Sequence, residues 1–187
     1  MTPEELLAPT YSQMLGALSG WLAKAVGKCG DEADDLLLAR LAPDMFPLAT
    51  QVRFACVQAL EGMYRLKGEE FPEAVGALLE EGRNAGDQPG TICDAQRRIA
   101  ETLETIEALA GQPTGTDPQR ELAHALPNGM VLDFTAASYA RDWAIGQFYF
   151  HVMTAYAILR HRGVELGKAD YVGHLLPLVR PGTMPRN

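Results

Sequence analysis

Apolar residues recur at alternating spacings of three and four through several long segments of this chain, and no other feature limits its fold as strongly. Such a repeat places apolar side chains on one face of an α-helix, and that face has to be buried against another element. The first stripe predicts a helix over 4–28, whose regular part is expected to begin after Pro9 because proline disturbs a helix. Its members are Leu7, Tyr11, Met14, Leu18, Trp21 and Ala25.

Two further stripes predict a second and a third helix. The second helix is expected over 48–66, where Pro47 suits a first helical turn and Gly68 suits a left-handed cap. The third is expected over 91–110 and should end at Gly111. Both helices therefore have defined ends as well as an apolar face.

The fourth predicted helix, over 135–160, contains the longest apolar run of the chain. Thr135 is a competent N-cap for it, and Gly163 is a suitable stop. Because apolar residues surround most of its circumference, we expect this helix to be the most enclosed member of the fold.

The connecting segments carry weaker signals. Residues 31–46 begin with acidic residues that suit a short helix start, and Pro43 ends it. Residues 69–90 mix proline, glycine and acidic residues with a short apolar patch, so we predict a long loop with one or two helical turns. Near the end of the chain, residues 175–179 are a candidate docking segment before a terminus rich in proline and glycine.

A β-hairpin is predicted between the third and fourth helices. Residues 121–135 alternate apolar and other side chains on either side of Asn128-Gly129, which is a strong signal for a tight turn. If these two residues form the turn, His124 lies opposite Asp133 across the strands. We interpret that pair as a surface contact that closes the hairpin, with a catalytic dyad as the alternative.

Together these elements predict an all-α four-helix bundle with a small β-hairpin between helices three and four. The length of 187 residues and the 47% hydrophobic content suit one core. We therefore expect a single domain over 1–174, followed by a C-terminal tail over 175–187.

Charge and cysteine content exclude several classes of partner. The net charge of −8 argues against binding to nucleic acid or to an anionic membrane surface, because both require clustered Lys and Arg. The acidic N-terminal segment does not resemble a signal peptide, and the apolar run in the fourth helix is interpreted as a buried helix rather than a membrane span. Cys29, Cys56 and Cys93 form no C-x-x-C pair, which favours reduced thiols in the cytoplasm.

His151 is the main candidate for chemistry, because it lies within the apolar run of the fourth helix. Gln147 precedes it by four residues and shares its face of the helix. A metal site would need further ligands from a facing helix, and only Asp44 or Gln51 is offered there. His151 is thus either a hydrogen-bonded residue of the core or of a pocket, or a general base or ligand. Tyr156 is interpreted first as core packing and second as pocket lining.

With these residues in view, the chain resembles an uncharacterised branch of the DinB/YfiT-like superfamily of bacterial four-helix bundles. The resemblance is carried by LAPDMFPLATQV (41–52), by the hairpin leading into the fourth helix, by FYFHVMTAYAILRHRGV (148–164) and by GKADYVG (167–173). It covers nearly the whole chain. It implies a four-helix bundle with a pocket between helices and a tendency to form homodimers through helices.

The resemblance also implies what the site lacks. Characterised members of the superfamily hold a divalent metal with one histidine from helix two and an H-x-x-x-H pair on helix four, and Gln147 and His151 align with that pair. Because only His151 matches, we expect a pocket of Gln51, Gln147, His151 and Tyr156 that binds a small molecule without a cofactor or is vestigial. The alternative is a transferase or isomerase with a degenerate zinc or nickel site of His151 with Asp44 or Gln51.

Overall fold

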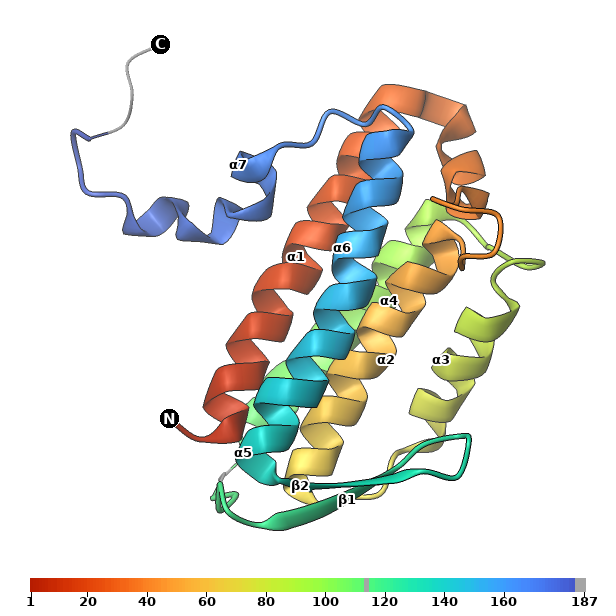
Figure 1. The fold of residues 1–187 in the computed structure, drawn as a ribbon. Coiled ribbons are helices and arrows are strands. Elements are labelled where there is room, and N and C mark those ends of the chain that lie inside the picture. The colour runs from red at the N-terminus through yellow and green to blue at the C-terminus, as the bar shows by residue number, and fades with distance from the viewer. Residues whose placement is uncertain (113–114, 184–187) are drawn as a thin grey trace.

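Four long helices lie side by side in the computed structural model, which describes residues 1–112 and 115–183 (Figure 1). The elements in chain order are α1 (Pro3–Cys29), the 3₁₀ helix η1 (Gly30–Leu38), α2 (Leu48–Lys67), α3 (Glu73–Asn84), α4 (Ile92–Ala110), β1 (Glu121–Ala125), β2 (Val131–Thr135), α5 (Ala136–Ser138), the π-helical η2 (Tyr139–Ala144), α6 (Ile145–His161), α7 (Lys168–Tyr171) and the 3₁₀ helix η3 (Gly173–Leu178). Helices α1, α2, α4 and α6 form the bundle, and their buried apolar side chains form one core. The predicted all-α bundle with a hairpin before its last long helix is confirmed.

Helix α1 begins earlier than the sequence suggested. Thr2 caps it, accepting a hydrogen bond from the Glu5 backbone, while the Glu5 carboxylate accepts one from the Thr2 backbone. This reciprocal capping box satisfies two backbone N–H groups that a helix end otherwise leaves unpaired. Pro9 therefore lies inside a helix that is already established, and the expectation that the regular part begins after it is wrong.

Helix α2, rather than α6, is the most enclosed helix. It packs against α1, α3, α4 and α6, and most of its residues are buried. Helix α6 leaves Phe150 at 58% and Met153 at 38% exposure, so the prediction from its apolar circumference is wrong. An apolar side chain on a helix can face the core or the solvent-exposed outer surface, and the hydropathy of the residue does not show which. No helix within the described residues combines the length and the apolar content needed to cross a membrane.

Helix α3 replaces most of the predicted loop between the second and third bundle helices. Val75 and Leu78 form a narrow buried stripe on it that packs against α2. At Gly82 an added Cβ would lie 2.7 Å from the ring of Phe54, so only glycine allows α3 to approach α2 this closely. The sequence pattern missed this helix because its apolar stripe is short and is interrupted by glycine.

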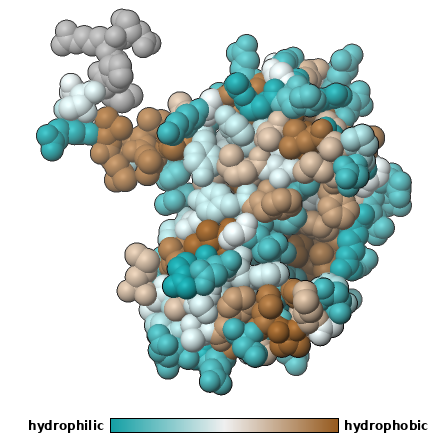
Figure 2. Space-filling model, viewed as in Figure 1, coloured by the Kyte–Doolittle hydropathy of each residue, from teal (hydrophilic) through white to brown (hydrophobic). Residues whose placement is uncertain are grey.

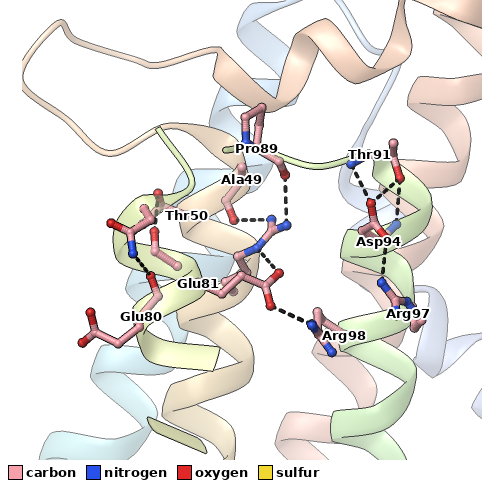
Figure 3. Close-up of polar contacts among 12 residues, drawn as sticks. Ala49, Thr50, Glu80, Glu81, Pro89, Thr91, Asp94, Arg97 and Arg98 are labelled. Carbon is pink, nitrogen blue, oxygen red and sulfur yellow. Dashed lines mark hydrogen bonds and ion pairs between the residues drawn. The ribbon is translucent and has the colours of Figure 1, made fainter. Parts of the chain in front are cut away.

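A buried arginine holds α3 in place, and Figure 3 shows the residues that bind it, Ala49, Glu81 and Pro89. Arg53 on α2 is 1% exposed, and its Nε donates to Glu81 Oε1 of α3 at 2.7 Å. Its other nitrogens donate to the carbonyls of Ala49, at 3.1 Å, and Pro89, at 2.9 Å. Burial by itself raises the pKa of Glu81, but hydrogen bonds from Arg53 and Arg98 lower it below its usual value. The carboxylate thus stays charged and links α2, α3 and α4.

The hairpin forms where it was predicted, but its register differs by one residue. Its turn spans three residues, because the backbone N–H of Leu126 donates to the carbonyl of Met130 at 2.7 Å, with Gly129 in the left-handed region at φ 86°. His124 consequently lies opposite Leu132, and the predicted pairing with Asp133 is wrong. A shift of one residue moves each side chain to the other face of a strand, and here it turns His124 into the protein, where it is 6% exposed.

The segment after α6 returns to the bundle and then leaves it. Helix α7 packs against α1, and η3 contacts α1 before it leads away from the four long helices (Figure 1). The apolar side chains of this last segment stand clear of the bundle surface (Figure 2). Leu178, for example, is 79% exposed, so the candidate docking segment over 175–179 does not dock on its own domain.

Replacing the buried arginine should release α3. We expect Arg53→Ala to lower the free energy of unfolding by about 3 kcal/mol, because the Glu81 carboxylate and two backbone carbonyls lose their hydrogen-bond donor. This value is at the lower end of the range for a broken buried ion pair, since Glu81 is partly exposed to solvent. Urea unfolding followed by circular dichroism measures the change. The matched control is Arg97→Ala, which breaks an exposed pair with Asp94 on α4 and should leave the midpoint unchanged.

Candidate functional site

The fold brings His151 of α6 against Gln51 of α2. The Nδ1 atom of His151 lies 2.9 Å from the side-chain oxygen Oε1 of Gln51. The amide nitrogen of Gln51 donates to the carbonyl of Phe46 at 3.2 Å, which fixes the orientation of the amide. Because Oε1 can only accept, Nδ1 of His151 must carry the proton and donate it. The other ring nitrogen, Nε2, therefore holds a free lone pair.

Aromatic rings surround this imidazole. The rings of Phe54 and Phe150 each meet it nearly at right angles, with centroids 5.3 Å away, and Phe46 packs against Phe54 at 5.5 Å. We call Phe46, Phe54 and Phe150 the aromatic cluster. His151 is 9% exposed, whereas Phe46 and Phe150 are 50% and 58% exposed. The Nε2 atom has no hydrogen-bond partner among the described residues and keeps contact with solvent.

The site lies at the surface rather than in a deep cavity. Five surface cavities of the described residues have volumes from 210 to 770 Å³, and His151 lines none of these five. Their lining residues come from the hairpin, from α3 and α4, from the N-terminal half of α1, from the C-terminal half of α2 and from the segment 112–120. A ligand at His151 would accordingly lie against the aromatic cluster with one side open.

Burial lowers the pKa of His151 to about 4. The imidazole is therefore neutral near pH 7, which agrees with an arrangement in which Nδ1 donates and Nε2 is free. A neutral imidazole with Nδ1 protonated can accept a hydrogen bond at Nε2, and its lowered pKa makes it a weaker base than an ordinary histidine. The site can therefore bind a group that donates a hydrogen bond.

The remaining predicted site residues are dispersed. Gln147 is half-buried one turn before His151, and within the described chain its side chain forms no hydrogen bond with it. Tyr156 packs edge-on against Trp21 of α1, with ring centroids 5.1 Å apart, so it faces a different neighbour. Asp44 is exposed in the turn before α2. The structure thus joins Gln51 and His151 and leaves the other three apart from that pair.

The donor set does not fit the divalent metal that the resemblance implies. Among the described residues, no three side chains of His, Cys, Asp and Glu gather closely enough to hold a metal ion. The partner of His151 is an amide oxygen, a weak ligand for zinc or nickel, and it is already occupied by the Nδ1–H group. Two donors of this kind cannot replace three histidines.

Two members of the aromatic cluster were missed at the sequence level. Phe54 follows Gln51 by three residues on α2, so their side chains share a face, and this spacing could have placed Phe54 near the site. Phe46 precedes the helix, and no periodic pattern includes it. Its position depends on how the chain turns into α2, which the sequence does not reveal.

Comparisons with known proteins show which class of fold and which family this chain belongs to. A crystal structure described as a DinB family member protein from Shewanella denitrificans is 32% identical, with a TM-score of 0.71 and coverage of 97% of this chain and 95% of that one. No curated protein is significantly similar. The fold is therefore that of the DinB-like class of helical bundles, as the resemblance predicted. Within that class, the family model described as "Domain of unknown function (DUF1993)" matches residues 5–172, and the chain belongs to this family.

The low pKa of His151 predicts a specific loss of stability in acid. Between pH 6.5, the ordinary histidine value, and about 4, the unfolded chain binds a proton that the folded chain excludes, so stability decreases as the pH falls through this window. At about 1.4 kcal/mol per pKa unit, the loss is about 3 kcal/mol.

The loss is measured as the difference between wild type and His151→Gln in urea unfolding at pH 7 and pH 4. The glutamine keeps hydrogen-bonding capacity without titrating, and other acid-sensitive groups such as His124 cancel in the difference. The exposed residue His161 supplies the control variant His161→Gln, which should keep the wild-type slope. An equal slope in wild type and His151→Gln would contradict the prediction.

Proposed function

We propose that this DinB-like protein binds a small molecule at His151 and does so without a metal. The observation that carries the proposal is the Gln51–His151 hydrogen bond, which leaves a neutral Nε2 acceptor in contact with solvent beside exposed aromatic rings. Binding sites for small molecules commonly combine an apolar, aromatic wall with a few polar groups that fix orientation. The aromatic cluster and Nε2 supply these two parts.

The chemistry of the site defines the class of ligand. Phe54 and Phe150 offer ring surfaces to an apolar or aromatic body, and Nε2 of His151 accepts one hydrogen bond from a hydroxyl or thiol. Because burial lowers the pKa of His151 to about 4, this imidazole is a weaker base toward a thiol than an ordinary histidine. Binding is therefore favoured over base catalysis at this nitrogen.

We further propose that the protein is a homodimer of the cytoplasm. Gly146, Phe150, Met153 and Ala157 follow one another on the outer side of α6 at helical spacing, and we call them the α6 stripe. Phe150 and Met153 are exposed at its centre, and an apolar stripe on an outer helix face is a typical contact between subunits. Three free cysteines suit a reducing compartment.

The binding proposal is tested with 4-fluorophenol as the probe. Its fluorine NMR signal should broaden on addition of protein, and 4-fluorotoluene, which lacks the hydroxyl, should bind about tenfold more weakly because one hydrogen bond contributes roughly 1–1.5 kcal/mol. His151→Leu should abolish this preference. Tyr156→Phe is the matched control and should keep it, since Tyr156 packs against α1. Equal binding of both probes by the wild-type protein would refute the role of Nε2.

The metal-dependent alternative makes the opposite prediction for zinc and nickel. We expect tag-free protein titrated with either ion to show the same stoichiometry in wild type and in His151→Ala, because Gln51 and His151 are an inadequate ligand set. Weak binding at the exposed thiol of Cys93 would be equal in both. One equivalent of metal that is lost in His151→Ala would support a degenerate transferase or isomerase site instead.

A further inference from the structure

A surface cavity of about 540 Å³ lies at the end of the bundle where α1 begins and α2 ends (Figure 1). This volume is typical of a site for a small molecule. Gln51 lies in the first turn of α2 and Leu66 in its last, so about 22 Å of helix separates this cavity from the His151 site. We call it the Glu4 cavity. The residues that line it include Glu4, Leu66, Lys67, Thr116 and Arg120.

Glu4 brings a buried carboxylate to this cavity. The residue is only 3% exposed, although glutamate is seldom buried without a partner. Its Oε1 atom accepts a hydrogen bond from the hydroxyl of Thr116, whereas Oε2 has no hydrogen-bond partner among the described residues. A buried carboxylate oxygen is costly unless a donor is paired with it, so this atom requires a partner.

The donors around Glu4 are too few for the acceptors. The Thr116 hydroxyl carries a single hydrogen, but it faces both Glu4 Oε1 and the carbonyl of Leu66, which lies 2.8 Å away. Lys67 also lines the cavity, and it donates to the side-chain oxygen of Gln112 at 3.2 Å instead of to Glu4. A ligand with an ammonium group would supply the missing donors, since each ammonium carries three N–H bonds.

Arg120 provides the opposite charge in the same cavity. Its Nη2 atom donates to the carbonyls of Arg65 and Leu66, at 3.1 and 2.7 Å, which fixes the guanidinium at the end of α2. Its Nε and Nη1 atoms have no acceptor within the described part of the chain. The Leu66 carbonyl thus meets Arg120 directly and Glu4 through Thr116, so the two charged groups lie close together. A guanidinium with free N–H groups is a good partner for a carboxylate.

We propose that the Glu4 cavity binds a free α-amino acid, whose ammonium group pairs with Glu4 Oε2 and whose carboxylate pairs with Arg120. A zwitterion satisfies both groups at once, whereas a simple amine would face the guanidinium and a simple anion would face the carboxylate. A metal ion fits less well, because no three side chains of His, Cys, Asp and Glu gather to hold one among the described residues. Glu69 and Asp117 also line the cavity, but both are exposed and solvent screens their charges.

Thermal unfolding with single amino acids tests the inference. We expect at least one of the standard L-amino acids to raise the Tm of the wild-type protein. Its methyl ester and the same molecule without the amino group each lack one charged group, so both should bind at least about tenfold more weakly in calorimetric titration. If no amino acid raises the Tm, or if both analogues bind as tightly as the parent, the inference is wrong.

The variant Glu4→Gln separates binding from folding. The amide keeps the size of the side chain and removes the buried charge, so the empty protein should resist urea at least as well as wild type. Binding of the amino acid should weaken at least about tenfold. The matched control is Glu5→Gln, which changes the neighbouring exposed carboxylate to a residue that also suits the capping box, and it should bind as wild type does. Unchanged binding by Glu4→Gln would overturn the inference, since water alone would then satisfy Oε2.

Discussion

The enclosure of α2 by four other helices is the constraint on which the rest of the structure depends. Three polar side chains, Thr50, Gln51 and Arg53, lie within this buried helix, and each must find a partner because an unpaired buried polar group is costly. Thr50 donates to the carbonyl of Gly82 at 2.9 Å and Arg53 holds Glu81, so both fix α3. Gln51 turns the other way and fixes His151 of α6. The candidate site is thus one of several consequences of burying a helix with polar residues near its start.

The long helices could be predicted because periodicity reports burial on one face, and their ends carried proline, glycine and capping residues. Helix α3 could not, since what holds it is a buried ion pair between residues distant in the sequence rather than a broad apolar stripe. The glycine located the hairpin, but the register of its strands depends on whether the turn holds two or three residues. That difference of one residue determines whether His124 faces solvent or the protein interior.

The candidate site was predicted only in part. His151 stood out as a polar residue in an apolar run, and Gln51 was one of two partners that a facing helix could offer. The sequence could not choose between Gln51 and Asp44, because that choice depends on the rotation of α2 against α6. It also could not reveal the proton on Nδ1, which follows from the Gln51 amide being held by Phe46.

A site built from an amide and a neutral imidazole has different requirements from one built around a metal. No charge is buried, so α2 and α6 can meet at Gln51 and His151 without the desolvation cost of an ion. Recognition must then come from shape and from a single hydrogen bond, and each is weak unless water is excluded. Phe150 is exposed on one side and contacts the imidazole on the other. A molecule that covers Phe150 therefore also reduces the access of water to the imidazole of His151. The selectivity of this site for its ligand depends on that exclusion of water.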